Sequence, residues 1–578
     1  MLSHIALVWL SVAAAVTSND ELESIPLICN PETFQSGSPK LGAGVTIKSI
    51  EAQEQRNHVS HAREHDLGIR ENLNFCQVKA HLNHEGSEDD VLVEVWLPLS
   101  RDDWNGRFQA TGGRGMATGL LGGALGPAVD QGYAASSTDG GHGVADSDDA
   151  TWVLRENGTI DWNLLINFAS RSIVESIILG KHFTEKYYGA KPKYSYWNGC
   201  SMGGRQGYML AQQYPHLVDG ILANAPAISL THLVMAEFWP QLVMKEEGLW
   251  MSDCELSYFR QKAMEDCDMI DGVNDGVMSE PGLCDFDPLH VIGQVFYCDD
   301  RPVEVSRNMA NIVKRISEGP RTPLKKSLWH GLMHGTSFEA LANTRITEEG
   351  IRRSQPFPIT SNFIQSFLVK DNSFNVTRLN YADYMALWIQ ANSEFGWILD
   401  ADEPNLTSLQ SSGTKLLTWH GTSDPLIPYQ STVQYRKRVE MIMGGAHEVD
   451  KFYRLFLAPG VEHCASGNGP VPTDPLSALV EWVENEQPPE TLEAGTMTYE
   501  GDRVTRDLCA WPGVLQYMGI GDAKRASSWS CHGGTVRPEE DKGQQALSDE
   551  DLEGGRAAQI LGGLKDRLQG LDMGLTIG

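Results

Sequence analysis

No two cysteines of this sequence form a C-x-x-C pair, although its 578 residues include ten cysteines. This absence argues against structural zinc sites and thioredoxin-type redox chemistry, both of which use closely spaced cysteines. In an exported chain, ten cysteines favour disulfides instead. The sequence also contains no internal repeat, so nothing indicates a solenoid or an array of small modules.

Long apolar runs are equally scarce. The first, residues 5–16, is short for a membrane span, and small residues follow it at Thr17 and Ser18. We therefore predict a secretory signal over residues 1–18 and a secreted, extracellular protein. Because no Lys or Arg precedes the run, an uncleaved anchor is the alternative. No later segment reaches membrane-spanning length, so we expect the mature chain to be soluble, with no membrane partner.

Basic residues are few relative to acidic ones. Lys and Arg number 46 against 76 Asp and Glu, which gives a formal net charge of −30 at pH 7. A surface of this charge disfavours nucleic acid and anionic membrane as partners. It suits a soluble enzyme in an acidic medium, but it identifies no substrate and no oligomeric state.

Three N-x-S/T sequons agree with export. Their asparagines, which we predict to be glycosylated, are Asn157, Asn375 and Asn405. Each triplet can also arise by chance, so the three together support export more than any one does.

Short β-forming runs alternate with helix candidates in two parts of the chain, which is typical of a mostly parallel α/β sheet flanked by helices. The alternation stops between residues 228 and 411, a segment rich in Trp that holds four of the cysteines. We interpret this segment as an inserted lid. The expected strands are 76–80, 91–96, 132–137, 194–197, 221–225, 415–419 and 452–457, and the expected helices are 161–184, 205–214, 430–443 and 475–485. The predicted division is a signal at 1–18, a first core part at 19–227, the lid at 228–411, a second core part at 412–532 and a loose tail at 533–578.

Residues 199–203, Gly-Cys-Ser-Met-Gly, form the G-x-S-x-G pattern of a nucleophile elbow. A strand is expected before the pattern and a helix after it, which would place Ser201 at the carboxyl edge of the sheet. The amide of Met202 would then begin a helix and could donate to a developing oxyanion. A glycine-rich structural turn is the alternative.

A serine nucleophile needs a base and a group that orients the base. Asp424 follows the strand expected at 415–419, and His463 follows the strand expected at 452–457. The order Ser, Asp, His, each after its own strand, is that of the α/β-hydrolases. We therefore predict a triad of Ser201, Asp424 and His463, and we take the nearby His420 as a structural residue.

Two cysteines strengthen this prediction. Cys200 precedes the expected nucleophile and Cys464 follows the expected base. If Ser201 and His463 meet in one site, these cysteines must lie close together, so a disulfide between them is expected. The alternative is a chance placement of two unrelated cysteines.

These motifs resemble those of the tannase and feruloyl esterase family. The resemblance lies in residues 199–207 (GCSMGGRQG), 420–424 (HGTSD) and 459–464 (PGVEHC), and it extends from about residue 40 to 532. It implies an α/β-hydrolase core with a large lid that forms much of the substrate pocket. It also implies that Ser201 is the nucleophile, His463 the base and Asp424 the group that orients it.

The resemblance extends to a glycine-rich loop that contributes to the oxyanion hole. The matching residues are Gly112 and Gly113, but Arg114 stands where a further glycine is expected, which leaves the donor open. Asp139 and His142 match a family Asp-x-Gly-His stretch, and we interpret them as structural residues.

An acidic loop at residues 267–277 suggests a calcium site. Its aspartates are hard oxygen ligands, and its glycines permit tight turns, although the spacing is not that of an EF-hand. A solvated acidic loop is equally compatible with the residues alone. The resemblance implies a structural Ca²⁺ and no catalytic cofactor. The ligands it implies are the side chains of Asp268, Asp271 and Asp275 and the carbonyls of Val273 and Val277.

The resemblance also implies further disulfides. It pairs Cys267 with Cys284 around the acidic loop, Cys29 with Cys76, and Cys509 with Cys531. Cys254 and Cys298 are left, and they can pair with each other.

The function we expect is hydrolysis of small-molecule or polysaccharide-linked phenolic-acid esters of the feruloyl type. Galloyl esters, as for a tannase, or another aromatic ester are alternatives within the same chemistry. An inactive hydrolase-like binding protein would not need all three triad residues, and a serine carboxypeptidase would lack the two cysteines. Phe238, Trp239 and Trp397 in the lid could stack on an aromatic substrate, but a buried structural role is the simpler expectation for each. The sequence does not identify the acyl or the alcohol group.

Overall fold

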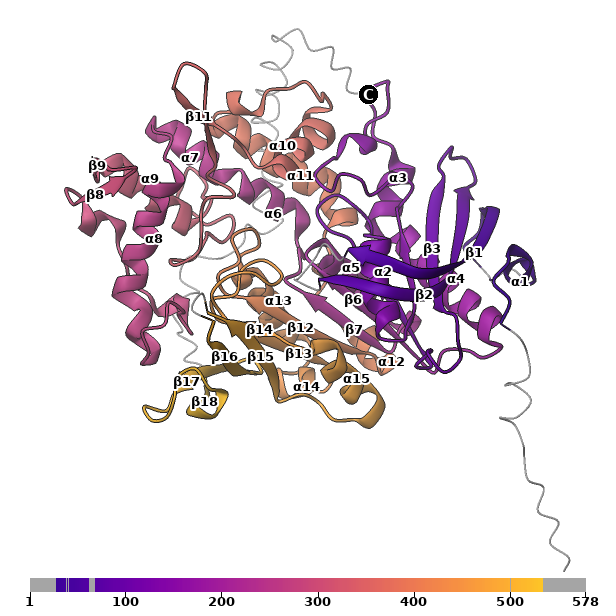
Figure 1. Ribbon diagram of the computed structural model, residues 1–578. Coiled ribbons are helices and arrows are strands. Elements are labelled where there is room, and N and C mark those ends of the chain that lie inside the picture. Colours follow the sequence, from indigo (N-terminus) through magenta and orange to yellow (C-terminus); the bar gives the residue numbers. More distant parts are fainter. Residues whose placement is uncertain (1–26, 38, 40, 62–67, 499–500, 534–578) are drawn as a thin grey trace, which may run out of the picture.

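The structure is a computed structural model that describes residues 27–37, 39, 41–61, 68–498 and 501–533. Its centre is a nine-stranded sheet in the order β1-β2-β3-β5-β4-β6-β7-β12-β13, flanked by helices (Figure 1). The pairs from β1 to β5 are antiparallel and those from β5 to β13 are parallel. The expected α/β class is therefore confirmed. The strands are β1 Val45–His61, β2 Ile69–His84, β3 Val91–Pro98, β4 Arg107–Thr111, β5 Ala134–Thr138, β6 Tyr194–Cys200, β7 Gly220–Asn224, β12 Lys415–Gly421 and β13 Tyr453–Ala458.

Helices cover both faces of this sheet because successive strand residues point to opposite sides. In β12, Leu416 packs into the core beneath α4, α5 and α13, whereas Leu417 packs into the core beneath α2 and α15. Strands that are apolar on both faces are typical of a parallel sheet buried between two helical layers. The helices of the core are α1 Pro31–Gln35, α2 Gly122–Asp130, α3 Trp162–Ile166, α4 Ser172–Tyr188, α5 Met202–Gln213, α13 Tyr429–Ile442, α14 Ala446–Val449 and α15 Pro475–Asn485.

Most of the expected helices are found close to their predicted bounds. The helix expected at 475–485 is α15, and the one expected at 430–443 is α13. The helix expected at 205–214 begins three residues earlier, at Met202. The helix expected at 161–184 is interrupted, because a π-helical turn at Asn167–Arg171 separates α3 from α4.

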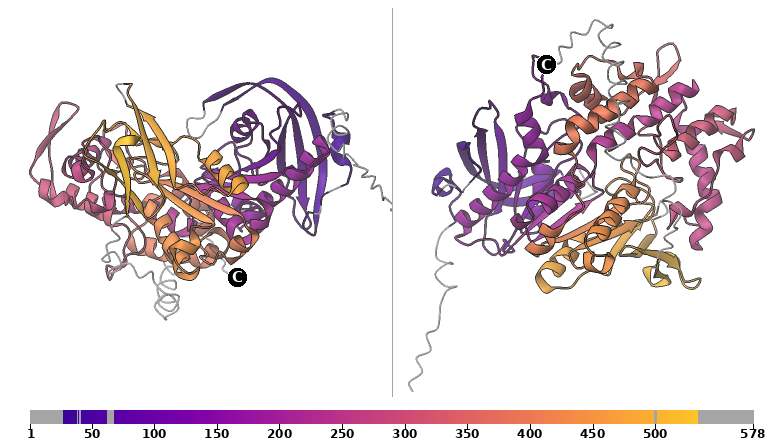
Figure 2. Two further views of the ribbon diagram at one scale, coloured as in Figure 1. Left: turned by 90° about the horizontal axis from the view of Figure 1, so that it is seen from below. Right: turned by 180° about the vertical axis from the view of Figure 1, so that it is seen from behind.

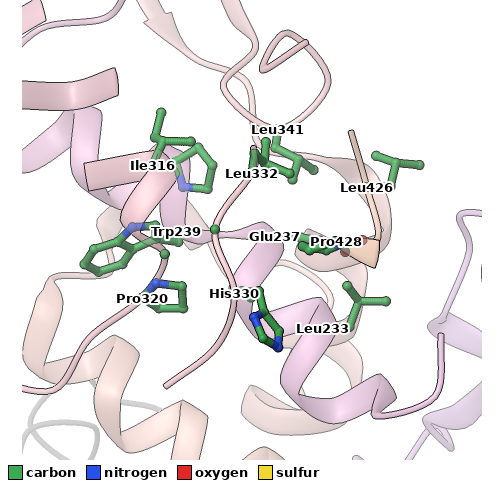
Figure 3. Close-up of a pocket in the computed structure, with 14 residues that line it drawn as sticks. Leu233, Glu237, Trp239, Ile316, Pro320, His330, Leu332, Leu341, Leu426 and Pro428 are labelled. Carbon is green, nitrogen blue, oxygen red and sulfur yellow. The ribbon is translucent and has the colours of Figure 1, made fainter. Parts of the chain in front are cut away.

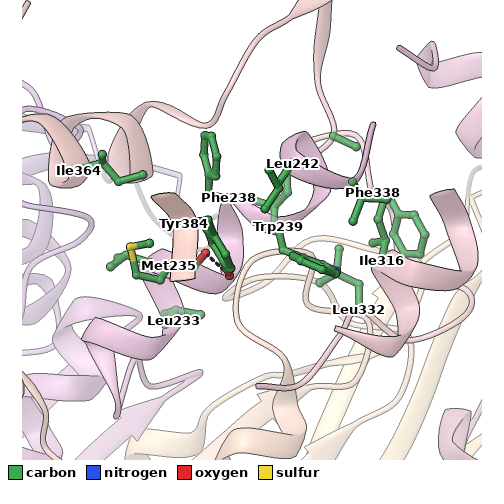
Figure 4. Packing of buried hydrophobic residues seen from close by; sticks show 14 of the residues in the cluster. Leu233, Met235, Phe238, Trp239, Leu242, Ile316, Leu332, Phe338, Ile364 and Tyr384 are labelled. Atoms are coloured by element: carbon green, nitrogen blue, oxygen red, sulfur yellow. Dashed lines mark hydrogen bonds between the residues drawn. The ribbon is translucent and has the colours of Figure 1, made fainter. Parts of the chain in front are cut away.

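The segment from 228 to 411 contributes no strand to the nine-stranded sheet. Except for α12 (Thr407–Ser412), which packs against α5, its elements lie together, apart from β1, β2 and β3 (Figures 1 and 2), and they share one apolar cluster (Figure 4). Met202 and Ile427, which lie outside the segment, belong to the same apolar cluster, so the segment packs directly on the loops that hold the expected triad. Its elements are α6 Leu230–Glu237, α7 Trp239–Glu247, α8 Asp253–Cys267, β8 Val295–Cys298, β9 Arg301–Glu304, α9 Arg307–Glu318, β10 Thr344–Ile346, β11 Arg352–Ser354, α10 Pro358–Phe363, α11 Tyr381–Leu399 and α12 Thr407–Ser412.

Two small antiparallel sheets, formed by one strand before α15 and four strands after it, were not predicted from the sequence. They consist of β14 Val471–Pro472, β15 Thr491–Met497 and β16 Arg503–Cys509, and of β17 Gly513–Tyr517 and β18 Trp529–Gly533. Within the described ranges, no helix is long and apolar enough to cross a membrane. The predicted signal at 1–18 and all but the first residue of the predicted tail lie outside the described residues.

Candidate active site

Ser201 occupies the turn between β6 and α5. Its backbone has φ 63° and ψ −119°, a left-handed conformation that costs free energy for a residue with a side chain. The flanking glycines make the turn possible, since a Cβ atom on Gly199 would lie 2.6 Å from the carbonyl carbon of Gly203. The Ser201 amide donates to the carbonyl of Asn224 in β7 at 3.0 Å, which fixes the turn on the sheet edge. This is the expected geometry of a nucleophile elbow.

A disulfide ties this turn to the loop that follows β13. Cys200 and Cys464 are bonded, with their Cα atoms 6.1 Å apart, so Ser201 and His463 flank one covalent link. The pairing agrees with the sequence prediction. All ten cysteines are paired, and the other four disulfides also match the expected pairs. These are Cys29–Cys76, Cys254–Cys298, Cys267–Cys284 and Cys509–Cys531.

Asp424 and His463 are in direct contact. The Oδ2 atom of Asp424 accepts a hydrogen bond from Nδ1 of His463 at 2.7 Å. The Oδ1 atom accepts from the amides of Leu426 and Ile427, both at 2.9 Å. Because Nδ1 is engaged by the carboxylate, Nε2 is the nitrogen of His463 that can accept a proton from a nucleophile.

A second histidine contacts the same carboxylate. His420, which is fully buried, places Nε2 3.2 Å from Asp424 Oδ2 and 3.0 Å from the carbonyl oxygen of Ile427. Both neighbours are acceptors, so Nε2 carries the proton, and Nδ1 accepts from the Thr432 hydroxyl at 2.9 Å. From sequence, His420 is expected to be a structural residue, and its contact with Asp424 is not predicted. The only sequence feature that points to this contact is that His420 stands four residues before Asp424.

The two histidines keep Asp424 ionised. Burial alone would raise the pKa of this carboxyl, because a charge is poorly solvated inside the protein. The charge of His463 and the hydrogen bonds from His420 and His463 outweigh burial and hold the pKa of Asp424 well below its usual range. An ionised aspartate in this position stabilises the imidazolium that forms when His463 accepts a proton.

Of the three amides expected in the oxyanion hole, two are already engaged. The amide of Gly112 donates to the carbonyl of Asn198 at 3.0 Å, and that of Gly113 donates to Oε1 of Gln206 at 3.0 Å. The Met202 amide begins α5 and has no acceptor among the described residues. Met202 is therefore the expected donor that the structure leaves available.

The segment from 228 to 411 places a buried carboxyl, that of Glu237, beside these loops. Glu237, at the end of α6, accepts a hydrogen bond from the Thr360 hydroxyl at 3.0 Å. It lines a small cavity of about 20 Å³ together with Leu426 and Pro428, which follow Asp424 (Figure 3). Burial raises the pKa of Glu237 to about 8, although the Thr360 hydrogen bond and the charge of His463 lower it. Nothing in the sequence indicates this residue, because a single Glu in a helix is usually solvated.

The remaining expected residues lie outside the triad. Asp139 accepts from the amides of Leu92 and Gly141, and His142 contacts the Thr118 hydroxyl at 2.8 Å, so both have structural partners. Phe238 and Trp239 are buried in the lid core (Figure 4), whereas Trp397 is 71% exposed on α11. The sequon residues Asn157, Asn375 and Asn405 are exposed.

The acidic loop is held by protein contacts. Asp268 accepts from the amides of Gly276 and Val277 at 2.9 and 3.1 Å, and Asp271 accepts from Val273 and Ser279. Asp275 pairs with Arg506 of β16 at 3.0 Å. Within the described ranges, no group of three or more His, Cys, Asp or Glu side chains is arranged to hold a metal ion. Calcium binding by Asp268, Asp271, Val273, Asp275 and Val277 therefore stays a prediction.

Comparison with known proteins gives consistent matches over most of the chain. Residues 76–532 match the "Tannase and feruloyl esterase" family. A probable feruloyl esterase of Arthroderma benhamiae is 44% identical over 463 residues, which cover 79% of this chain and 86% of that protein. A tannase of Aspergillus oryzae is 27% identical, covering 89% and 97%. The solved structure of a tannin acyl hydrolase from Aspergillus niger superposes with a TM-score of 0.79 at 26% identity, covering 87% of this chain and 95% of that one.

Proposed function

Because this chain belongs to the tannase and feruloyl esterase family and is a carboxylic ester hydrolase, we propose that it is a secreted serine esterase acting on esters of phenolic acids. The contact between Asp424 Oδ2 and His463 Nδ1, beside a disulfide that ties the His463 loop to the Ser201 turn, is the observation that carries the mechanism. The 44% identity to a probable feruloyl esterase supports the feruloyl type.

In the acylation half of the reaction, Ser201 is the nucleophile. Its hydroxyl oxygen bonds to the ester carbonyl carbon while His463 Nε2 takes the hydroxyl proton. The carbonyl oxygen becomes an oxyanion, which the Met202 amide stabilises from the positive end of α5. Collapse of this intermediate breaks the bond to the alcohol oxygen, and His463 returns the proton to the departing alcohol. The product of this half is an acyl group on Ser201.

Deacylation repeats these steps with water. His463 takes a proton from a water molecule, whose oxygen bonds to the acyl carbon. The second oxyanion collapses, the bond to Ser201 Oγ breaks, and the proton on His463 returns to that oxygen. Asp424 remains ionised throughout, since it orients the imidazole and stabilises its positive charge without taking the proton.

A substrate panel tests the acyl specificity. The wild-type protein is assayed on methyl ferulate, methyl caffeate, methyl gallate and tannic acid under one set of conditions. We expect the highest kcat/KM on the hydroxycinnamate esters, because the more similar relative is a probable feruloyl esterase. Preference for methyl gallate and tannic acid would assign a tannase instead, and hydrolysis of none of the four would contradict the proposed substrate class.

Export and calcium complete the proposal. Five disulfides and three exposed sequons support an oxidising, extracellular location, in keeping with the signal proposed at residues 1–18. The acidic loop is proposed to bind a structural Ca²⁺ through Asp268, Asp271 and Asp275. What supports this is the presence of three carboxylates in one short loop with left-handed glycines at 272 and 276, which the Cys267–Cys284 disulfide closes.

A further inference from the structure

A large cavity lies beside the catalytic loops and plays no part in the mechanism above. Its volume is about 530 Å³, which is within the usual range for small-molecule sites of about 300–1,000 Å³. It touches the first residue of each catalytic loop, Thr422 before Asp424 and Pro459 before His463. His330 also borders the smaller cavity that Glu237 lines (Figure 3), so the two cavities share part of their lining. Ser201 does not line the large cavity.

One wall of this cavity is a single face of α13. Gln430, Gln434 and Lys437 follow one another at intervals of four and three residues, which places them on the same side of the helix. Gln434 uses only Oε1, toward His330 at 3.2 Å, and its NH₂ group has no acceptor among the described residues. Oε1 of Gln430 is buried and has no hydrogen-bond partner within the described ranges. The helix therefore presents two side-chain amides to the cavity, and each has an atom that can still form a hydrogen bond with a ligand.

A second wall carries an aromatic ring. Trp511 lies in the turn between β16 and β17, and its amide donates to the carbonyl of Leu455 at 2.8 Å. The disulfide Cys509–Cys531 fixes the same turn to β18. Lys437 Nζ lies 5.9 Å from the centre of the Trp511 ring, so this face of α13 and the ring meet at one corner of the cavity.

The charges in the lining cancel. Arg321 and Glu318 form an ion pair at 3.5 Å, and the remaining charged residues are Lys437 and Glu280. Burial lowers the pKa of His330 to about 4, so this side chain adds no charge at neutral pH. A balanced lining favours a neutral ligand over an anion or a cation.

This lining has the chemistry of a site for a sugar, because it combines amide groups and an aromatic ring with zero net charge. A sugar ring has hydroxyl groups that both donate and accept, which amides can satisfy, and an apolar face of C–H groups that packs on an indole. A ligand without hydroxyl groups would cover Oε1 of Gln430 and the NH₂ group of Gln434 without giving either a hydrogen bond, which is unfavourable.

We propose that this cavity binds the saccharide part of the ester substrate, with Trp511 as the packing surface and Gln434 as a hydrogen-bonding residue. This inference rests on the proposed function, because it assigns the alcohol side of the same ester. The cavity borders the loops that carry Asp424 and His463, so a saccharide bound there is attached close to the ester bond that these residues cleave.

Kinetics on two substrates test the proposal. The wild-type protein and the variants Trp511→Ala, Gln434→Ala and Trp397→Ala are assayed on methyl ferulate and on a feruloylated pentose trisaccharide. Trp397→Ala is the matched control, since Trp397 is an exposed tryptophan that does not line the cavity. We expect Trp511→Ala to lower kcat/KM on the trisaccharide ester about tenfold, mainly through KM, and to leave methyl ferulate unchanged. Gln434→Ala should act in the same direction and Trp397→Ala on neither substrate.

Titration of the free pentose trisaccharide into the wild-type protein gives an independent reading. Binding that Trp511→Ala abolishes supports the site. The proposal would be overturned if Trp511→Ala lowered kcat/KM equally on both substrates, so that the ratio of the two values did not change. It would also be overturned if the wild-type protein did not bind the trisaccharide. A wild-type protein that hydrolyses neither ester contradicts the proposed function itself, and the titration still reports on the cavity.

Discussion

His420 and Asp424 are in contact through a buried hydrogen bond, with Nε2 of the histidine 3.2 Å from Oδ2 of the aspartate. This is the oxygen that also accepts from His463 at 2.7 Å, so two imidazoles hold one carboxylate. Asp424 can therefore orient His463, because its own carboxylate is held by His420 and by the amides of Leu426 and Ile427. His420 is a positioning residue, since it acts on the proposed base only through Asp424.

We predict that His420→Ala lowers kcat/KM on the preferred ester by about tenfold or more, the cost of losing a hydrogen bond to a charged group. Loss of this donor raises the pKa of Asp424 and makes the carboxylate a stronger partner for His463. The acid limb of the pH–rate profile should then move to higher pH. His420→Gln, which keeps an N–H donor, should recover part of the activity. A variant with reduced activity but an unmoved acid limb would assign His420 a merely structural role.

Ser201→Ala tests the nucleophile. Without the hydroxyl oxygen no acyl-enzyme forms, so kcat should fall by roughly 10⁴-fold or more. The fold should be unaffected, because alanine is smaller and the Ser201 backbone contacts do not use the hydroxyl. Ester hydrolysis and circular dichroism on the same preparation check both expectations. Near-normal activity in the folded variant would contradict the proposed role of Ser201 as the nucleophile.

The proposed catalytic residues could be predicted from sequence because the patterns that mark them are local. Ser201 stands in a pattern of glycines that a strained turn requires, and Asp424 and His463 each follow a strand of the parallel sheet. The contact of Cys200 with Cys464 followed from the reaction, since a nucleophile and its base must meet. The hydrogen bonding of Gly112 and Gly113 could not be found in this way, because it depends on the partners Asn198 and Gln206 reaching those amides in three dimensions.

The parts of the fold that the sequence did not reveal have weak local patterns. The π-helical turn at Asn167–Arg171 keeps a helical periodicity of apolar residues. The sequence therefore predicts one continuous helix across it. The hairpins β15–β16 and β17–β18 have only one buried face and are short, and they are positioned by tertiary contacts: the Cys509–Cys531 disulfide joins β16 to β18, and β16 packs on β13. Glu237 shows the same limit, since only the tertiary structure buries its carboxyl beside the catalytic loops.

Burial of Glu237 predicts a pH dependence of stability. Its pKa rises from an ordinary value of 4.5 to about 8 in the folded protein. Between these values the folded chain holds a proton that the unfolded chain has released, so the free energy of unfolding falls as the pH rises, by a few kcal/mol in order of magnitude. Glu237→Gln removes this titration and should flatten the loss of stability between pH 5 and about 8.

Thermal unfolding across this pH range measures the effect. Glu51→Gln is the control, because Glu51 is exposed on β1 and loses the same charge without any change in burial. The expected result is a smaller decrease in Tm with pH for Glu237→Gln than for the wild type and the control. Identical Tm profiles for all three proteins would contradict an uncharged, buried Glu237.

Calcium binding predicts an effect of chelation on stability without an effect on chemistry. A ligand that binds only the folded state adds about 2.7 kcal/mol to the free energy of unfolding when present at 100 times its Kd. EDTA should therefore lower Tm, and Asp268→Asn should lower Tm and remove the response to EDTA. Activity per folded molecule, assayed well below Tm, should not change. An unmoved melting curve, with no calcium found by elemental analysis, would exclude the site.

The disulfide between Cys200 and Cys464 gives the most direct test of the active site, because it joins residues 264 apart in sequence through the turn of Ser201 and the loop of His463. Replacing both cysteines with alanine should destabilise the protein by up to about 6 kcal/mol in the chain-entropy account. Replacing Cys254 and Cys298, whose separation is 44 residues, should cost about 4 kcal/mol by the same account, so both double variants lose several kcal/mol of stability.

Their activities should nevertheless differ. Loss of the Cys200–Cys464 bond releases the His463 loop from the nucleophile, and a displacement of about 1 Å can reduce the rate on the order of a hundredfold. The Cys254–Cys298 bond lies in the lid between α8 and β8, so its loss should leave kcat nearly unchanged below the melting transition. Peptide mapping without reduction establishes the pairing first, and kcat is then measured well below both Tm values. Equal kcat values in the two double variants would show that this disulfide stabilises the fold without positioning the base.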